Sequence, residues 1–406
     1  MKRGNLPLSE IAAVAPPRGT NERPADAAAP QPVQSPGQTP PILYIAGSGR
    51  SGSTLLERLI GEMPGFVNVG ELIDLFRGAI PRGERCGCGL PVASCPFWTG
   101  VAQRAFGGWE TAGAAALHSL QARVARQRRI PRLLAMRMTG QGFKSDIVAY
   151  GRYYASLYRA IAAEAEVTYV VDASKWPVQA LALGRAGLDV RVIHLVRDVR
   201  GVAYSLNKQQ VARPHAVGGT EFMWRNPPAG AAARWAAHQG QAELLRRCGI
   251  PVTRVRYEDF VRQPRHTIEV ALADLGLSAV PSHLLPIGEG RVMLGRSHGL
   301  SGNPSRFRDG EIALRADEAW RDQMSRRDRF VVTMIGLPFL LRYGSRRGGQ
   351  RARPDAAGRS AGPDPAIPPS VSPNPATPPS VSPGPATPAR AAEPSTLSAP
   401  DRGGLT

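Results

Sequence analysis

Residues 41–60 read PILYIAGSGRSGSTLLERLI and contain the pattern that decides the fold. An apolar run at 42–46 is followed by a loop of glycine, serine and arginine, and then by leucines at helical spacing. A strand that leads through a glycine-rich turn into a helix is typical of a parallel α/β sheet. Such a turn directs several backbone N–H groups and the positive end of the helix dipole at one point. The stretch therefore predicts a phosphate-binding loop after the first strand.

The same alternation continues along the chain. Further strands are predicted at 66–69, 168–171, 191–196 and 252–256. Helices are predicted at 53–63, 113–127, 147–164, 176–185, 199–210, 231–247, 266–275 and 317–326. This order predicts an α/β fold of the P-loop type, with three layers around a central, mainly parallel sheet. Ligands of such sheets bind outside the carboxyl ends of the strands, so the residues after each strand are the candidate site.

Proline is concentrated at the two ends of the chain. Residues 1–40 and 346–406 are poor in aromatic residues and hold 22 of the 38 prolines. Segments of this composition bury too little apolar surface to offset the entropy lost on ordering. We therefore predict a disordered segment over 1–40, one folded domain over 41–345 and a disordered proline-rich tail over 346–406.

The chain is basic, with a formal net charge of +19 that falls mostly in residues 41–345. A positive field favours anionic ligands such as nucleic acid, polysaccharide, anionic lipid or a phosphorylated cofactor. A GC-rich genome, which encodes arginine where other genomes encode lysine, accounts for the same excess of positive charge equally well. Charge alone therefore predicts an anionic ligand without identifying it.

No run of residues reaches the ~18 apolar positions that a membrane-spanning helix needs. The nearest, at 330–341, contains Pro338 and is interpreted as a buried C-terminal helix. The N-terminus has no continuous apolar stretch typical of a signal peptide. Four cysteines are too few to staple a domain of this size. These observations predict a cytoplasmic protein without a transmembrane segment.

The glycine-rich loop departs from the Walker A motif at one position. Ser53 stands where that motif has the lysine that contacts the β- and γ-phosphates. Cleavage of a triphosphate is therefore not favoured, and Arg50 offers a fork of donors suited to a terminal phosphate or sulfate instead. The predicted anion-binding residues are Gly47, Gly49, Arg50, Ser51, Gly52, Ser53 and Thr54.

A second basic position follows the strand at 191–196. Arg197 directly follows that strand, and Ser205 lies eight residues further on in the predicted helix. A guanidinium and a hydroxyl in this arrangement suit a second anionic group, which would imply a ligand with two phosphates. The alternative is that Arg197 only pairs with Asp198 or Glu258.

Taken together, the two motifs resemble the sulfotransferases that use 3′-phosphoadenosine 5′-phosphosulfate (PAPS). The family's G-x-x-R-S-G-[ST]-[ST] loop, which holds the 5′-phosphosulfate, is matched by GSGRSGST at 47–54. Its later segment for the 3′-phosphate is matched by LVRDVRGVAYS at 195–205. Other matching stretches are DASKWP at 172–177, RYEDF at 256–260 and GNPSRF at 302–307. The resemblance covers the whole predicted domain and is closest to the bacterial branch and the protein-tyrosine sulfotransferases.

The resemblance implies roles for further residues. Glu71, which follows the second strand, matches the general base of the tyrosine-sulfating enzymes, and the alternative is a surface or helix-capping glutamate. Lys175 matches a lysine that stabilises the leaving phosphate, with Arg50 as a second catalytic cation. Arg306 matches a late element that closes over the donor. The histidine base of the cytosolic small-molecule enzymes has no match, which leaves His298 and His215 as minor candidates.

Cys86, Cys88 and Cys95 form a C-x-C-x6-C pattern. Three thiols could bind zinc, but a structural zinc site normally has four ligands and a wider spacing within each pair. We therefore interpret them as thiols that pack a loop near the acceptor.

The predicted function is a sulfotransferase that moves a sulfuryl group from PAPS to a hydroxyl acceptor by in-line displacement. This chemistry requires no metal, and nucleic acid is not an expected partner. Two alternatives are a P-loop small-molecule kinase and a non-catalytic polyanion-binding protein. The acceptor stays open among sugar, lipid, peptide tyrosine and natural-product hydroxyls.

Overall fold

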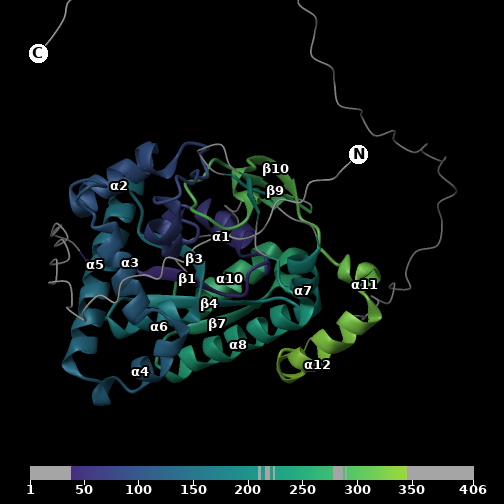
Figure 1. Ribbon diagram of the computed structural model, residues 1–406. Coiled ribbons are helices and arrows are strands. Elements are labelled where there is room, and N and C mark those ends of the chain that lie inside the picture. The colour runs from purple at the N-terminus through teal and green to yellow at the C-terminus, as the bar shows by residue number, and fades with distance from the viewer. Residues whose placement is uncertain are drawn as a thin grey trace, which may run out of the picture. The chain divides into compact units, whose positions relative to one another are not determined.

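Five parallel strands form the central sheet of the domain (Figure 1). The computed structural model describes residues 38–208, 212–214, 220–222, 225–277, 287–288 and 290–344. The strand order is β2-β3-β1-β4-β7, and the neighbouring strands pair in parallel. The strands are β1 (Ile42–Gly47), β2 (Phe66–Asn68), β3 (Tyr169–Lys175), β4 (Val190–Val196) and β7 (Val252–Arg256). All five strands predicted from the sequence are confirmed.

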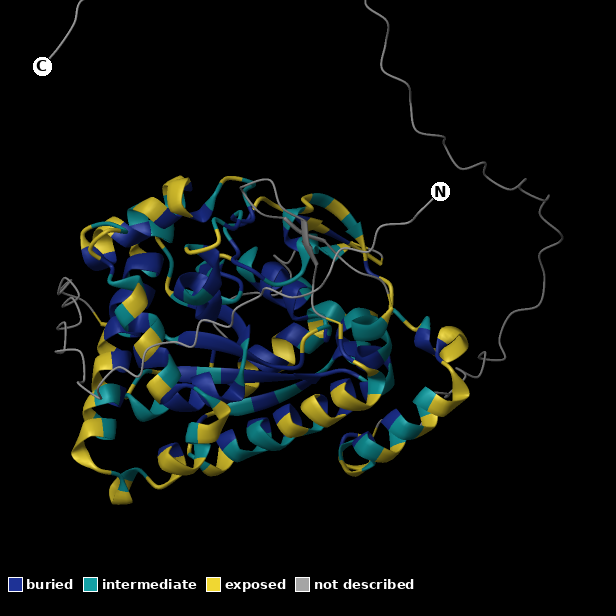
Figure 2. Cartoon of the chain, viewed as in Figure 1, coloured by how far each residue is buried: buried dark blue, intermediate teal, exposed yellow. Residues whose placement is uncertain are grey.

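Both faces of this sheet are buried, because successive side chains of a strand point to opposite sides. On β1, Leu43 and Ile45 pack in one core with helices α1 (Ser53–Gly61), α9 (Tyr257–Arg262) and α10 (Pro264–Asp274). Ile42 and Tyr44 pack in a second core with helices α2 (Pro96–Phe106), α3 (Ala114–Val124), α5 (Gln141–Ala165) and α6 (Pro177–Arg185). Figure 2 shows the strands as a buried centre, with exposed residues on the outer sides of the helices. The three-layer α/β fold predicted from the sequence is therefore confirmed.

Most helices lie where the apolar spacing predicts them. They are α1 (Ser53–Gly61), α2 (Pro96–Phe106), α3 (Ala114–Val124), α4 (Ile130–Leu134), α5 (Gln141–Ala165), α6 (Pro177–Arg185), α7 (Val199–Asn207), α8 (Pro228–Arg247), α9 (Tyr257–Arg262), α10 (Pro264–Asp274), α11 (Trp320–Gln323) and α12 (Arg326–Arg342). Short 3-10 turns occur at Leu72–Asp74, Val92–Ser94, Gln127–Arg129, Met136–Met138 and Pro304–Phe307, and a π-helix at Leu75–Ala79.

Several elements differ from the sequence-based expectation. Helix α2 was not predicted, although Pro96 at its first position favours a helix start. Helix α11 spans only four residues of the predicted 317–326, because Met324 has an extended backbone and Ser325 caps the next helix. Small antiparallel sheets were also missed, formed by β5 (Ala212–Pro214) with β6 (Thr220–Phe222), and by β8 (Ile287–Gly288), β9 (Arg291–Leu294) and β10 (Gly310–Ala313).

The predicted C-terminal helix is confirmed, but the prediction that it is buried was wrong. One face of α12, with Val332 and Leu340, packs in a core with α7 and α8. Phe330 and Met334 on the opposite face are 68% and 51% exposed. None of the described helices is long and apolar enough to cross a bilayer. The predictions for residues 1–37, for 346–406 and for His215 lie outside the described residues.

Candidate functional site

A cavity of about 1050 Å³ opens at the carboxyl ends of the central strands. Its wall includes the loop after β1, the residues after β2 and the end of β3, as expected for an open parallel sheet. The charged lining residues are five cations and two acids, so the wall suits an anion. They are Arg50, Arg126, Arg128, Lys175, Arg234, Glu71 and Asp74.

The glycine-rich loop predicted from the sequence lines this cavity with Gly49, Arg50, Gly52, Ser53 and Thr54. Gly52 caps helix α1 in a left-handed conformation with φ +91°. The chain therefore passes directly from the loop into the first turn of α1. Ser51 steadies the turn, because its hydroxyl donates to the carbonyl of Ser48 at 2.7 Å. The buried Ser48 hydroxyl itself has no hydrogen-bond partner within the described part of the chain. The loop therefore offers backbone and hydroxyl donors to an anion.

Arg50 projects from the same loop. Its backbone has φ +66°, an uncommon conformation for a residue with a side chain. Burial, and next the nearby Arg197 guanidinium, lower the pKa of Arg50 from its ordinary value. An anion placed between the two arginines would relieve their repulsion. Gly47, which ends β1, lies outside the cavity lining.

Glu71 reaches the cavity from the turn after β2. Its backbone N–H donates to the carbonyl of Leu300 at 2.9 Å, and the N–H of Leu300 donates to the carbonyl of Val69 at 2.9 Å. Gly70 between them has φ +72°, and a Cβ atom there would lie 2.3 Å from the Leu300 backbone. Only glycine leaves room for this close contact between the two backbones. The turn after β2 and the late segment around Leu300 therefore fix the position of Glu71 jointly.

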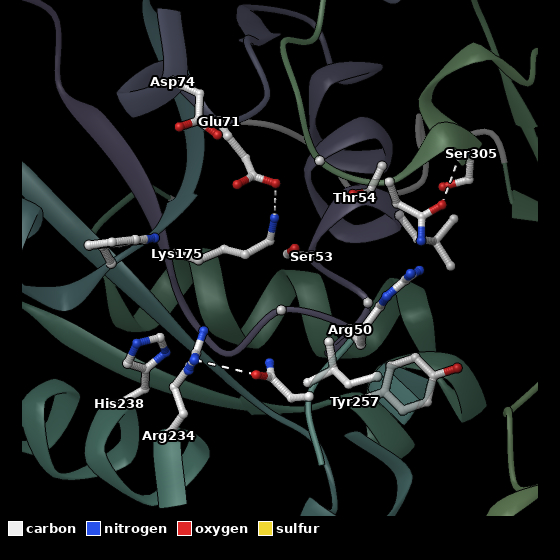
Figure 3. Close-up of a pocket in the computed structure, with 18 of the residues that line it drawn as sticks. Arg50, Ser53, Thr54, Glu71, Asp74, Lys175, Arg234, His238, Tyr257 and Ser305 are labelled. Atoms are coloured by element: carbon white, nitrogen blue, oxygen red, sulfur yellow. Dashed lines mark hydrogen bonds and ion pairs between the residues drawn. The ribbon is translucent and has the colours of Figure 1, made fainter. Parts of the chain in front are cut away.

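Lys175 ends β3 and forms an ion pair with Glu71, drawn as a dashed line in Figure 3. The two side chains are only 12% and 16% exposed, so the pair is shielded from solvent. Lys175 has φ +68°, and the pairing of β1 with β3 is irregular at this point. This local departure from a regular strand directs the ammonium group into the cavity.

A buried hydrogen-bond network connects the turns that carry Glu71 and Lys175. The Asp172 carboxylate accepts from Tyr158 Oη at 2.6 Å and from the Ser174 N–H at 2.8 Å. Ser174 Oγ in turn accepts the N–H of Ile73 at 2.9 Å. Burial raises the pKa of Asp172 to about 6. The network fixes the turn after β2 against the end of β3.

Arg197 lies beside the glycine-rich loop at the end of β4. Its Nη1 donates to the carbonyl of Arg50 at 2.9 Å, and its Nη2 lies 3.2 Å from Asp317 Oδ2. The guanidinium also stacks over Tyr257, 4.6 Å from the ring centre. The pairing with Asp198 or Glu258 considered above is not observed, since Asp198 pairs with Arg200 instead.

Five predicted donor-binding residues are not among those that line the cavity: Gly47, Ser51, Arg197, Ser205 and Arg306. Ser205 is partly buried on α7, next to Leu206, which does line the cavity. Arg306 is 5% exposed, and its Nη2 donates to the carbonyl of Arg85 at 3.2 Å. The neighbouring residues Asn303 and Ser305 face the cavity instead. Donor contact by Arg306 and Ser205 stays a prediction.

Several residues that line the cavity were not predicted from the sequence. Arg126, Arg128 and Arg234 come from a 3-10 turn, its flank and helix α8, where no local motif marks them. His238 also lines the cavity, and its Nε2 lies 3.4 Å from Gln127 Nε2. Burial lowers the pKa of His238, which favours its neutral form. Only the basic composition could have indicated these cations.

His298, a minor candidate for the base, does not line the cavity. It lies among Cys86, Cys88 and Cys95, with its Nδ1 3.3 Å from Cys95 Sγ and 3.6 Å from Cys86 Sγ. All four cysteines of the chain are free thiols. The histidine that the sequence analysis treated as a base candidate therefore belongs to the cysteine loop.

The chain resembles known proteins in its sequence and in its fold. Residues 41–281, more than half of the chain, match the model of the sulfotransferase family. No curated protein sequence matches the chain. The sulfotransferase domain from the Synechococcus PCC 7002 olefin synthase is 19% identical with a TM-score of 0.41, over 75% of this chain and 96% of that domain. The sulfotransferase domain from the curacin biosynthetic pathway is 16% identical with a TM-score of 0.39, over 74% and 98%.

The match over residues 41–281 contains the glycine-rich loop, Glu71, Lys175 and Arg197, which surround or adjoin the cavity. The chain therefore belongs to the sulfotransferase family.

Proposed function

We propose that the chain transfers a sulfuryl group from PAPS to a hydroxyl acceptor. The observation that carries this proposal is the hydrogen bond of 2.9 Å from Arg197 to the Arg50 carbonyl, which joins the end of β4 to the loop after β1. Arg50 and Arg197 follow two neighbouring strands and contact each other. Two cations in this position suit a nucleotide with phosphates at two positions. Because Ser53 replaces the Walker lysine, a kinase reaction is the weaker alternative.

The proposed mechanism begins with the Glu71–Lys175 ion pair. A bound phosphosulfate would attract the Lys175 ammonium and leave the Glu71 carboxylate to accept a hydrogen bond from the acceptor hydroxyl. Glu71 then takes the hydroxyl proton while the acceptor oxygen bonds to sulfur. The bond from sulfur to the bridging oxygen breaks, and that oxygen keeps the electron pair. Lys175 and Arg50 stabilise its negative charge on the released adenosine 3′,5′-bisphosphate.

The nucleotide specificity can be tested by calorimetry on the full chain. We expect adenosine 3′,5′-bisphosphate to bind more tightly than either adenosine 5′-monophosphate or ATP with Mg²⁺. Tight binding of ATP with Mg²⁺ and none of the bisphosphate would favour the kinase. Equal binding of all three, displaced by heparin, would favour a polyanion-binding protein. Transfer itself is measured with ³⁵S-labelled PAPS and a cell extract, followed by mass analysis of the labelled product.

The role of Arg197 needs a second comparison, because this residue also shapes the loop through the Arg50 carbonyl. Arg197→Ala should weaken bisphosphate binding by about 10- to 100-fold, as expected for a charged hydrogen bond. Binding of adenosine 5′-monophosphate should change less than about threefold if the guanidinium reads the 3′-phosphate. An equal loss for both nucleotides would assign Arg197 to loop shaping. Arg191→Ala, at the opposite end of β4, is the control and should bind both normally.

A further inference from the structure

Four potential metal ligands converge in one place outside the cavity. Cys86 and Cys88 lie in a tight turn between Arg85 and Pro91, which form an isolated antiparallel bridge. Cys95 precedes helix α2, and His298 arrives from the segment after β9. Their four ligand atoms lie within 4.8 Å of one another. This set joins residues that are distant in the sequence, which is why the cysteine spacing alone gave only three ligands.

Three of the six separations between ligand atoms fit a tetrahedral zinc site, and the other three are at most 4.8 Å. Bonds of about 2.3 Å to sulfur and about 2.0 Å to nitrogen imply ligand separations of about 3.8 Å between sulfurs and about 3.5 Å between sulfur and nitrogen. The observed separations are 3.6 Å for Cys88 Sγ–Cys95 Sγ, 3.6 Å for Cys86 Sγ–His298 Nδ1 and 3.3 Å for Cys95 Sγ–His298 Nδ1. Each is therefore within a few tenths of an ångström of a tetrahedron edge.

Hydrogen bonds among protonated thiols do not explain this arrangement as well. A neutral imidazole nitrogen accepts one hydrogen bond, yet His298 Nδ1 faces two sulfur atoms at short distance. A metal ion explains both contacts, because it binds the imidazole nitrogen and deprotonated cysteine sulfurs at the same time.

The ring of His298 is held in place from two sides. Phe97 stacks on it with ring centres 4.7 Å apart and planes inclined by 17°. Trp98 Nε1 donates to the His298 carbonyl at 2.9 Å. Both aromatic residues lie in the first turn of α2, which begins directly after Cys95. The histidine is therefore oriented before a metal binds, which lowers the entropic cost of binding it.

We propose that Cys86, Cys88, Cys95 and His298 bind one structural Zn²⁺ ion. Three thiolates and one imidazole in a tetrahedron are typical zinc ligands. Four protein ligands close the site, and none of them lines the cavity, so the metal takes no part in the transfer reaction. Its role is to tie the cysteine turn to the segment at 298–303. That segment carries Leu300 and Gly302, which contact Glu71.

Metal content of the purified full chain tests this proposal independently of PAPS. Protein produced with zinc in the medium and purified without chelator should hold about one zinc per chain by elemental analysis. Cys88→Ser and His298→Ala should each lose most of this metal, and treatment with a chelator should lower the Tm of the wild-type chain. Cys248→Ser is the matched control, since its thiol lies outside the cluster, and it should keep its zinc.

A measurement on the unaltered chain covers the case in which the variants fail to fold. X-ray absorption at the zinc edge should give three sulfur neighbours and one nitrogen neighbour, and Co²⁺ should produce the absorption bands of a tetrahedral thiolate complex. A chain without stoichiometric zinc and without these cobalt bands would overturn the proposal. So would zinc that persists in both ligand variants, or a Cys88–Cys95 disulfide found by mass spectrometry of the freshly purified chain.

Discussion

At the scale of single residues, Glu71 and Lys175 neutralise each other when no donor is bound. Their side chains are shielded from solvent, so their mutual attraction is screened less than at the surface. In the proposed mechanism, a donor with a negatively charged phosphosulfate would compete for the ammonium group and expose the carboxylate to the acceptor. The order of binding expected from this proposal is donor first and acceptor second, because Glu71 stays paired until the donor arrives.

Glu71→Gln separates binding from transfer. The amide cannot take a proton, so we expect transfer from ³⁵S-labelled PAPS to fall by about 10²- to 10⁴-fold. Binding of adenosine 3′,5′-bisphosphate should stay at least as tight as in the wild-type chain, because Lys175 loses its competing partner. The exposed Glu110→Gln is the control and should keep full activity. Transfer within about threefold of wild type in Glu71→Gln would place the base elsewhere.

Glu71, Lys175 and Arg50 could be placed near the site because each lies at or within a few residues of the carboxyl end of a strand, and the family resemblance suggested their roles. The ends of the strands can be predicted from the local sequence pattern alone, so the positions of these residues can be predicted too. Arg126, Arg234 and His238 reach the same cavity from a turn and from helix α8, and their positions depend on how those elements pack. His298 joins the cysteines in the same way, through contacts between distant parts of the chain.

At the scale of elements, the loop between β1 and α1 depends on a glycine that packs against another element. A Cβ atom on Gly52 would lie 2.6 Å from Tyr257 Cδ2, and the residue has φ +91°. The strands and helices around this loop were predictable because their apolar periodicity is local. The β8–β10 sheet was not, since β8 and β9 are only two and four residues long.

Gly52→Ala should destabilise the chain even without nucleotide. The left-handed conformation costs alanine about 1–2 kcal/mol, and the contact with the Tyr257 ring adds a further cost. We expect the Tm to fall by several degrees in a thermal denaturation experiment. Gly49→Ala is the matched control for stability, since its Cβ would have no atom within 4 Å. Equal Tm values for the two variants would show that the loop tolerates a side chain at Gly52.

At the scale of the whole molecule, the stability should depend on the protonation of one buried acid. Glu57 on helix α1 is 4% exposed, and burial raises its pKa to about 8, while Lys175 partly opposes the shift. The folded chain therefore holds this proton more tightly than the unfolded chain does. The resulting stabilisation is complete below the ordinary pKa of about 4.5 and is lost as the pH rises through about 8.

Glu57→Gln removes this dependence, because the amide stays neutral. We expect the difference in Tm between variant and wild type to grow in favour of the variant from pH 6 to pH 9. Glu110→Gln should follow the wild-type curve at every pH. A constant difference between Glu57→Gln and wild type over this range would mean that Glu57 titrates near its ordinary pKa.

The backbone pairing between Gly70 and Leu300 also bears on how the protein acquires activity during synthesis. A ribosome that has released β1 to β4 has not yet made Leu300, so the turn that carries Glu71 cannot be completed on the nascent chain at that stage. Contacts between such distant residues form slowly, since a long loop has to close first. The proposed catalytic turn would thus be finished only late in the synthesis of each molecule.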